Sequence, residues 1–338
     1  MRQAVMTAPG VIEFRDVPEP VPGPDEVLLR VRRIGVCGSD IHVYYGCQPF
    51  TSYPMIQGHE FSAVVEATGE QVTNIKLGTK VTALPQVVCG KCRPCRRGDY
   101  HICDKLRVQG FQAPGCAQDL FVTRAEKIVP LPDTFSFEQG ALVEPTAVAA
   151  HAVGRAGRVA GKNTVVLGAG PIGNLVAQVA RASGAHVLIT ELNEYRLDIA
   201  RRCGLENTSN AREESLENAS KRVFGEDGFD LAFECVGVEP TLTAAVACIG
   251  KGGAIVIVGV FPQKPCVDVA MIGDHELSVI GSLMYKYEDY QRAVELIASG
   301  HVVTPPLESN HFPLSDYLSA YRFIEQQAGN SMKVFIDV

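Results

Sequence analysis

The sequence predicts an α/β protein of two domains, the first rich in β-strands and the second a doubly wound parallel sheet. Three observations support this prediction. The 338 residues exceed the roughly 250–300 at which a single hydrophobic core stops growing. Strand-like and helix-like segments alternate from about residue 145 onwards. A glycine-rich turn, Gly168-Ala-Gly170-Pro-Ile-Gly173, stands between the first strand and the first helix of that series.

The composition is that of an ordinary globular protein, with 46% hydrophobic and 20% charged residues. The net charge of −7 gives no general basic field for nucleic acid. The uncharged stretches 41–59 and 163–180 contain Gly, Pro, Asn and Gln, so neither predicts a membrane helix. The first ten residues, MRQAVMTAPG, lack the apolar core of a signal peptide. We therefore expect a soluble cytoplasmic protein with no nucleic-acid or membrane partner.

The first part of the chain is predicted to consist of strands and long loops. Four prolines between Val17 and Pro24 force an extended or turning backbone there. Runs rich in branched apolar residues, bounded by turn residues, predict strands. These runs are 27–32, 61–65 and 80–84.

The second part alternates regularly, which predicts a parallel sheet covered by helices on both faces. An Ala-rich helix is expected at 146–153. Strands are expected at 164–167, 187–190, 230–236 and 253–260, and helices at 172–180 and 196–202. A helix at 287–298 and a β segment from 333 to the end follow, and that segment is expected to return to the first domain. The predicted boundaries are 148–284 for the parallel-sheet domain, with 1–147 and 285–338 forming the other.

The glycine turn stands where a dinucleotide site requires it. Gly168 permits the tight turn, Gly170 lets the backbone approach a pyrophosphate, and Gly173 lets helix and strand pack closely. The helix that opens with Pro171 and Ile172 offers N–H donors and the positive end of its dipole to the phosphates. A glycine turn of an α/β domain without a nucleotide is the alternative.

Glu191 ends the next expected strand, 18 residues after Gly173. Its carboxylate would accept hydrogen bonds from the ribose 2′-OH and repel a 2′-phosphate, which favours NAD over NADP. Arg196, five residues further on, would soften that preference.

Four cysteines predict a structural metal site. The pattern Cys89-x2-Cys92-x2-Cys95-x7-Cys103 closes a tetrahedral sulfur shell of the kind that holds Zn²⁺ with no open position. Lys and Arg side chains nearby would offset the −2 charge of such a site. An iron–sulfur cluster and a loop without metal are the alternatives.

The motifs, taken in their order along the chain, resemble those of the zinc-dependent medium-chain alcohol dehydrogenase family. They are Gly-Val-Cys37-Gly-Ser-Asp, Gly-His59-Glu60, the four-cysteine loop, Leu-Val-Glu144-Pro and the glycine turn. The resemblance implies a GroES-like catalytic domain and a Rossmann domain, with one structural and one catalytic Zn²⁺ and NAD as cofactors. It covers nearly the whole chain and is strongest for the sorbitol and polyol dehydrogenase branch.

The resemblance also assigns roles that spacing alone does not join. Cys37, His59, Glu60 and Glu144 match the catalytic zinc ligands, with Glu60 either a ligand or linked through water. Ser39 and His42 match the relay that takes the substrate proton towards solvent, and Asp40 matches the carboxylate that orients the zinc-binding histidine. A dimer or tetramer is implied in the same way.

The substrate class is read from a polar stretch after the first ligand. The segment Gly46–Pro54 resembles dehydrogenases that oxidise sugar acids such as galactonate or gulonate at the fifth carbon. Tyr45, Gln48 and Tyr53 are expected to line the substrate pocket, although loop capping would explain them equally. The segment Pro114–Ala117 departs from the Gly-Gly-Phe of many members and leaves one pocket wall undefined.

The expected reaction is oxidation of a secondary alcohol of a polyol or sugar acid to a ketone, with hydride transfer to NAD. The alternative enzymes are a small-diol (butanediol-type) dehydrogenase and an L-threonine dehydrogenase. A relative that lost its catalytic zinc, or a redox-sensing or zinc-storing protein, is a different class. The complete ligand set and the glycine turn argue against both.

Overall fold

The structure is a computed structural model that describes residues 1–48 and 50–338. The chain forms two compact units. Unit 1 consists of residues 1–144, 286–294 and 308–338, and unit 2 of residues 145–285 and 295–307. The sequence-based division differs from this one, because it gave all of 285–338 to the first domain. Residues 295–307 join unit 2, where Val303 exchanges two hydrogen bonds with the side-chain amide of Gln178.

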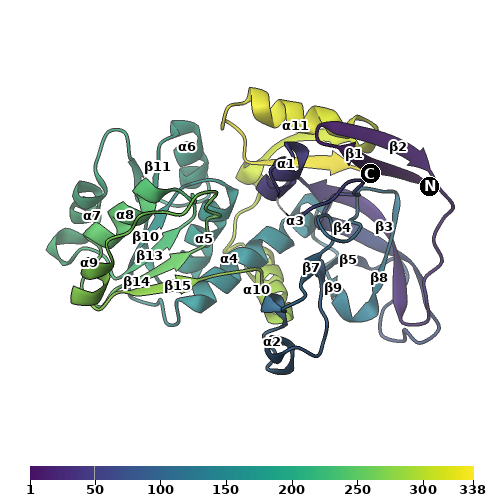
Figure 1. Cartoon of the computed structure of the whole chain (residues 1–338), viewed down its shortest axis with the longest axis horizontal. Helices are drawn as coiled ribbons and strands as arrows, with labels where there is room; N and C mark the ends of the chain where they lie inside the picture. Colours follow the sequence, from purple (N-terminus) through teal and green to yellow (C-terminus); the bar gives the residue numbers. More distant parts are fainter. Residues whose placement is uncertain (49) are drawn as a thin grey trace. The chain divides into compact units, whose positions relative to one another are not determined.

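Unit 1 is built on a twisted, mainly antiparallel sheet with the strand order β16-β17-β3-β4-β5-β9 and with β8 also paired to β3 (Figure 1). Its strands are β3 (Glu26–Gly35), β4 (Glu60–Thr68), β5 (Lys80–Ala83), β8 (Leu120–Arg124), β9 (Ile128–Pro130), β16 (Glu308–Pro313) and β17 (Lys333–Asp337). Two small ribbons accompany it, β1 (Arg2–Ala8) with β2 (Val11–Asp16) and β6 (Gln86–Val87) with β7 (Arg107–Val108). The final strand therefore returns to the first unit, as predicted.

The hydrophobic core of unit 1 includes one face of this sheet, because alternate residues of its long strands are apolar and point to the same face. Leu29, Val31 and Ile34 of β3 are almost fully buried, as are Phe61 and Val65 of β4. The helices are α1 (Gly38–Tyr44), α2 (Arg93–Arg96), α3 (Phe137–Ala141), α11 (Tyr317–Gln326) and most of α10 (Tyr287–Ala298). Among the described residues of the chain, no helix is long and apolar enough to cross a membrane.

Unit 2 confirms the predicted doubly wound sheet. Its strands are all parallel and follow the order β12-β11-β10-β13-β14-β15, so the chain leaves β10 in one direction and then returns to its other side. They are β10 (Asn163–Leu167), β11 (His186–Glu191), β12 (Thr208–Asn210), β13 (Leu231–Glu234), β14 (Ala254–Ile257) and β15 (Ser278–Gly281). The helices are α4 (Val143–Arg155), α5 (Pro171–Ala182), α6 (Glu194–Arg202), α7 (Leu216–Phe224), α8 (Glu239–Cys248) and α9 (Val269–Asp274). The reversal of strand order at β10 is where such sheets bind ligands.

Candidate active site

The short helix α1 arranges the first group of predicted residues. Cys37 stands at its N-cap, where the Asp40 carboxylate accepts a hydrogen bond from the Cys37 backbone N–H at 2.9 Å. This bond fixes the first turn. The Ser39 hydroxyl lies 3.1 Å from the Cys37 sulfur. His42 is on the same face one turn later and is exposed, so α1 leads from the thiol to the surface.

His59 precedes β4 and faces α1. Its Nδ1 lies 3.5 Å from the Asp40 Oδ1. Both atoms are buried, and neither has a hydrogen-bond partner among the residues that the structure describes. Burial disfavours the charged imidazolium, but the Asp40 carboxylate and Cys37 outweigh it, so the pKa of His59 is raised well above its usual value. A metal on Nε2 would fix the proton on Nδ1 and direct it at Asp40, the usual partner of a metal-binding histidine.

Three predicted ligands converge. One ligand atom from each of Cys37, His59 and Glu60 lies within 4.8 Å of the other two. A thiolate, an imidazole and a carboxylate are the donors of catalytic zinc sites. Together with the adjacent buried atoms His59 Nδ1 and Asp40 Oδ1, which lack a hydrogen-bond partner among the described residues, this donor set fits Zn²⁺. Glu144, in the first turn of α4, is also buried but lies outside this mutually close group.

Glu60 has a partner that the sequence did not indicate. The ammonium of Lys333, on β17, contacts both carboxylate oxygens of Glu60. Burial alone would lower the pKa of Lys333, but Glu60, Cys37 and Glu144 outweigh it, and the pKa is raised. The site therefore contains a fixed positive charge among its anions.

The segment Pro114–Ala117, where the sequence left one wall of the pocket undefined, crosses the backbone of residues 56–58 at close range beside His59. The Gly115 N–H donates to the Ile56 carbonyl at 2.7 Å, and the Cys116 N–H donates to the Gly58 carbonyl at 3.0 Å. A Cβ on Gly115 would lie 2.3 Å from the Gly58 oxygen. The ring of Phe111 packs on the imidazole of His59 with 4.8 Å between centroids. The segment Pro114–Ala117 thus supports the turn that carries His59.

Replacing Gly115 by alanine is expected to destabilise unit 1 by about 1–3 kcal/mol, because the new Cβ forces residues 57–58 away from their partners. The free energy of unfolding measured with denaturant should fall, and so should the amount of metal retained at the Cys37–His59 group. Gly154→Ala is the matched control, since nothing lies within 4 Å of its added Cβ. Equal stability of the two variants would contradict the supporting role of the crossing.

The four cysteines form a second group, in a lobe of residues 88–108 that we call the cysteine lobe. Their sulfurs all lie within 4.8 Å of one another. Zn–S bonds of about 2.3 Å in a tetrahedron place sulfurs about 3.8 Å apart. The Cys92 sulfur lies 3.8 Å from that of Cys103 and 3.3 Å from that of Cys95. Backbone N–H groups of Lys91 and Cys92 lower the pKa of the Cys89 thiol to about 6. The geometry fits a structural zinc.

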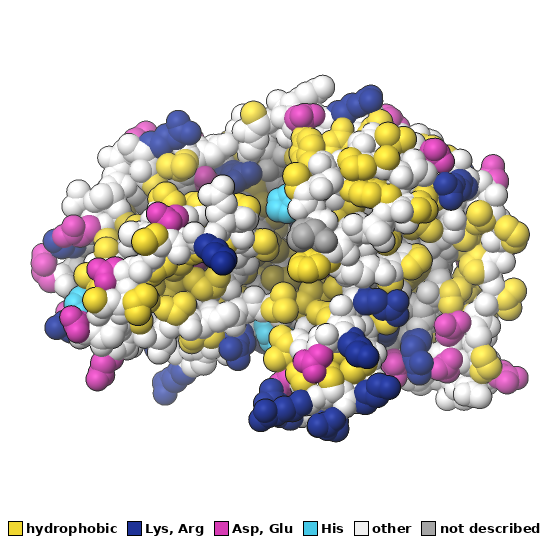
Figure 2. Space-filling view, in the orientation of Figure 1, with side chains coloured by type: hydrophobic (Ala, Val, Ile, Leu, Met, Phe, Trp, Pro, Cys, Tyr) yellow, Lys and Arg dark blue, Asp and Glu magenta, His cyan; other side chains and the backbone are white. Residues whose placement is uncertain are grey.

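The surface of the cysteine lobe is strongly basic. Figure 2 shows Lys and Arg side chains gathered over the region of α2. The exposed cations of the lobe are Lys91, Arg93, Arg96, Arg97, Lys105 and Arg107. They offset the negative charge that four thiolates would place on one metal ion, as the sequence predicted.

Cys103→Ser is expected to remove about one zinc ion per chain, because a hydroxyl does not replace the fourth thiolate. The lobe has little regular structure of its own, so residues 88–108 should become sensitive to proteolysis. Metal analysis and limited proteolysis check both effects. Cys266→Ser, at an exposed free thiol, is the control. Unchanged zinc content in Cys103→Ser would contradict the assignment.

Of the three predicted substrate-lining residues, Gln48 and Tyr53 hydrogen-bond to backbone groups, whereas Tyr45 is exposed. The Tyr53 hydroxyl donates to the Val43 carbonyl, and the Gln48 side-chain oxygen accepts from the Phe50 N–H at 2.7 Å. Gln48 therefore caps its own loop, and Tyr53 joins that loop to the last turn of α1. Tyr45 is 48% exposed. Pro49, in the same segment, lies outside the described residues.

In unit 2 the glycine turn has the predicted form. Gly168 has a φ of +96°, in the region that favours glycine. A Cβ on Gly173 would lie 1.9 Å from the Gly168 oxygen, so only glycine allows this contact. Gly170 caps α5, and Pro171 occupies its first turn.

Glu191 at the end of β11 is held in place by backbone donors. Its carboxylate accepts from the N–H groups of Ala169 at 2.9 Å and Leu192 at 2.8 Å. Arg196 lies 3.7 Å from it. These hydrogen bonds hold the carboxylate in one position beside the glycine turn.

A cavity of about 520 Å³ opens between the glycine turn and the ends of the neighbouring strands. Gly168, Gly170, Glu191 and Arg196 line one part of it. Apolar side chains that the sequence did not indicate line another part, namely Leu216, Val236, Val238 and Pro240. Pro171, Ile172 and Gly173, in the first turn of α5, are not among the residues that line it. A polar corner beside an apolar slot suits a ribose and a purine ring.

Each of the two units contains a region that matches a known protein family. Residues 23–133 match the alcohol dehydrogenase GroES-like domain, and residues 171–299 match the zinc-binding dehydrogenase family. A 2-dehydro-3-deoxy-L-galactonate 5-dehydrogenase of Pseudoalteromonas atlantica is 38% identical over 89% of this chain and 88% of its own. An L-threonine 3-dehydrogenase of Legionella pneumophila is 31% identical over 96% of both chains. The sorbitol dehydrogenase of Bacillus subtilis is 32% identical over 99% of this chain and 97% of its own.

The fold has close relatives among solved structures. A zinc-binding dehydrogenase of Sinorhizobium meliloti bound to NADP superposes with a TM-score of 0.91 at 28% identity, and the match covers 100% of this chain and 99% of that one. The donor groups, the glycine turn and these matches lead to one conclusion: the chain belongs to the zinc-binding alcohol dehydrogenase family, with a GroES-like domain and a Rossmann domain.

Proposed function

We propose that the protein oxidises a secondary hydroxyl of a sugar acid or polyol to a ketone, with NAD as hydride acceptor. The observation that carries the proposal is the group formed by Cys37, His59 and Glu60 beside the Ser39 hydroxyl. The sugar-acid substrate class is supported by the identity of 38% to the galactonate-type dehydrogenase. The sorbitol dehydrogenase supports a polyol in the same way.

Two residues of α1 transfer the proton of the substrate hydroxyl towards solvent. Ser39, half-buried next to Cys37, is positioned to accept the proton of the substrate hydroxyl, and His42 passes it to solvent. Asp40 holds the orientation of His59. Cys37, His59 and either Glu60 or Glu144 would hold Zn²⁺. The chemistry that bound zinc and NAD supply is polarisation of the hydroxyl and acceptance of hydride.

Cofactor choice follows from Glu191. Its carboxylate stands where a ribose 2′-OH would donate to it, and its charge disfavours a 2′-phosphate. We therefore propose NAD as the preferred cofactor, with Arg196 leaving a residual tolerance for NADP.

The test is a panel of substrates with the zinc-loaded protein and NAD, followed by the absorbance of reduced nicotinamide. The panel holds sugar acids of the galactonate and gulonate series, sorbitol and galactitol, 2,3-butanediol and L-threonine. We expect kcat/KM on a sugar acid or polyol to exceed the others by at least about tenfold. Turnover on L-threonine or butanediol alone would contradict the proposed substrate class.

We also propose a cytoplasmic homo-oligomer, a dimer or a tetramer. The cysteines of the described residues form no disulfide, which suits a reducing compartment. Strand β15 ends the sheet of unit 2, with Val279 47% and the following Leu283 55% exposed. An edge strand of this kind favours pairing with another chain. Light scattering should give a mass of two or four chains, and a monomer would contradict this proposal.

A further inference from the structure

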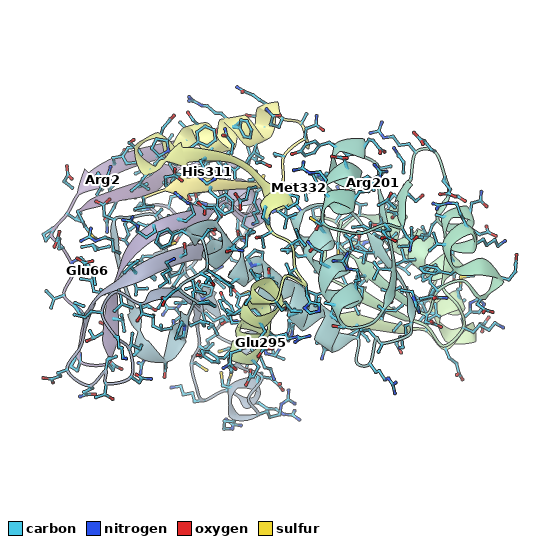
Figure 3. All side chains as sticks on the ribbon, turned by 180° about the vertical axis from the view of Figure 1, so that it is seen from behind. Arg2, Glu66, Arg201, Glu295, His311 and Met332 are labelled. Atoms are coloured by element: carbon cyan, nitrogen blue, oxygen red, sulfur yellow. The ribbon has the colours of Figure 1, made fainter. Side chains whose placement is uncertain are left out.

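The helix α1, which carries Ser39 and His42, is too short to be stable by itself. It has seven residues, whereas an isolated helix needs roughly 12–15 residues to be even marginally stable in water. Packing against neighbouring elements must therefore fix where the two side chains lie. One neighbour is α11, which links the parallel strands β16 and β17 and packs against both. In Figure 3, His311 marks β16 and Met332 directly precedes β17.

Tyr321 of α11 is linked to α1 at two points. Its ring stacks on that of Tyr44, the last residue of α1, with 4.8 Å between the centroids and 11° between the planes. Its hydroxyl donates to the side-chain oxygen of Gln57 at 2.7 Å. The side-chain nitrogen of Gln57 in turn donates to the carbonyl of Asp40, in the first turn of α1, at 3.2 Å. One tyrosine therefore holds both ends of the helix.

These hydrogen bonds are shielded from water and have a fixed direction. Tyr321 is 2%, Gln57 1% and Asp40 0% exposed, so water does not replace a partner that is lost. The Asp40 carbonyl can only accept a hydrogen bond, so the Gln57 amide must turn its nitrogen towards α1 and its oxygen towards Tyr321. The tyrosine hydroxyl is then the donor that this oxygen requires.

We propose that Tyr321 and Gln57 are positioning residues for the proton transfer, because together they fix α1 and with it the side chains of Ser39 and His42. This inference rests on the proposed function, which assigns the proton transfer to those two groups. Ser39 directly precedes Asp40, and His42 lies between the two points of attachment. A shift of α1 at either point therefore moves the groups that pass the proton, and reaction rates are sensitive to shifts of about 1 Å.

The first test is Tyr321→Phe in the zinc-loaded protein, which keeps the ring on Tyr44 and leaves the Gln57 oxygen without its donor. We expect kcat to fall by about tenfold or more and the ratio of kcat in H2O to kcat in D2O to rise, because proton transfer becomes slower. NADH binding should be unchanged, since unit 2 alone forms the nucleotide cavity. Amide hydrogen exchange in residues 37–45 should be at least about tenfold faster.

The matched control is Tyr290→Phe. Tyr290 is also buried in unit 1, but its hydroxyl donates to the Ala83 carbonyl of β5. This variant should keep the kcat, the isotope ratio and the exchange of α1 that the wild type has. Wild-type values for all three in Tyr321→Phe would overturn the inference. Equal losses in the two variants would overturn it as well, because any buried hydroxyl would then have the same effect.

The double variant Tyr321→Phe/Gln57→Leu separates positioning from a purely structural role. It removes both partners, so no buried amide oxygen is left without a donor, and such replacements are close to neutral for stability. We expect its denaturant midpoint to recover towards that of the wild type, while kcat and the exchange of α1 stay as in Tyr321→Phe. Recovery of kcat and exchange together with the midpoint would overturn the inference. The double variant carries this test by itself if Tyr321→Phe does not fold.

The exchange measurement also separates this inference from the proposed function, because it needs no turnover. A wild-type chain inactive on every substrate of the panel would refute the proposed function. Faster exchange of residues 37–45 in the two variants would still support the attachment of α1 through Tyr321 and Gln57. Exchange at the wild-type rate in both variants would overturn that attachment, whatever the activity of the wild type.

Discussion

Replacing Cys37 by alanine is expected to lower kcat/KM by about three orders of magnitude or more, because it removes a ligand of the metal that polarises the substrate. The binding of NADH should be unchanged, since the nucleotide cavity is formed by unit 2 alone. Steady-state kinetics and a fluorescence titration of NADH measure the two effects.

The control for Cys37→Ala is Cys266→Ala, which changes an exposed free thiol of unit 2. Cys266→Ala should keep full turnover. Its zinc content should exceed that of Cys37→Ala by one ion per chain. Substantial turnover by Cys37→Ala would contradict the role of this group in catalysis. Loss of NADH binding in the same variant would point to a folding defect.

Glu191→Ala is expected to change the cofactor preference by about two orders of magnitude. The lost hydrogen bonds to the ribose weaken NAD by about 1–3 kcal/mol, and the lost charge no longer repels a 2′-phosphate. Arg196, 3.7 Å from Glu191 in the wild type, becomes available to that phosphate. The measurement is the ratio of kcat/KM for NAD to that for NADP.

The matched control is Glu217→Gln, on the exposed face of α7, where Glu217 pairs with Lys221. Its ratio should equal that of the wild type, since it removes the same charge outside the cavity. An unchanged ratio in Glu191→Ala would show that this carboxylate does not contact the ribose.

The parts that the sequence predicted well are those in which the chemistry is local. The glycine turn and the four-cysteine loop need only short spacings, and the structure confirms both close groupings. The parallel sheet followed because buried strands and amphipathic helices alternate along the chain. Cys37 and His59 came together through the family resemblance, since no spacing rule joins them.

The misses have physical causes as well. Lys333 is 273 residues from Glu60. Nothing in the sequence around a lysine near the start of a strand indicates that it will be buried beside a carboxylate. For Gln48 and Tyr53 the sequence left open whether the side chains line the substrate pocket or cap loops. Both hydrogen-bond to backbone groups, and their place in the substrate pocket stays a prediction. The apolar wall of the cavity comes from segments that follow the strands, such as Val236 after β13 and Leu216 at the start of α7. The order of the sheet sets which of these segments are neighbours.

The most direct test of the catalytic metal site is a crystal of the zinc-loaded protein measured at the zinc absorption edge. Two anomalous peaks per chain are expected. One should lie about 2.0–2.3 Å from the Cys37 sulfur and the His59 Nε2, and the other among the four cysteines of the lobe. Full zinc occupancy in the lobe with no peak between Cys37 and His59 would show that these residues do not form a catalytic metal site.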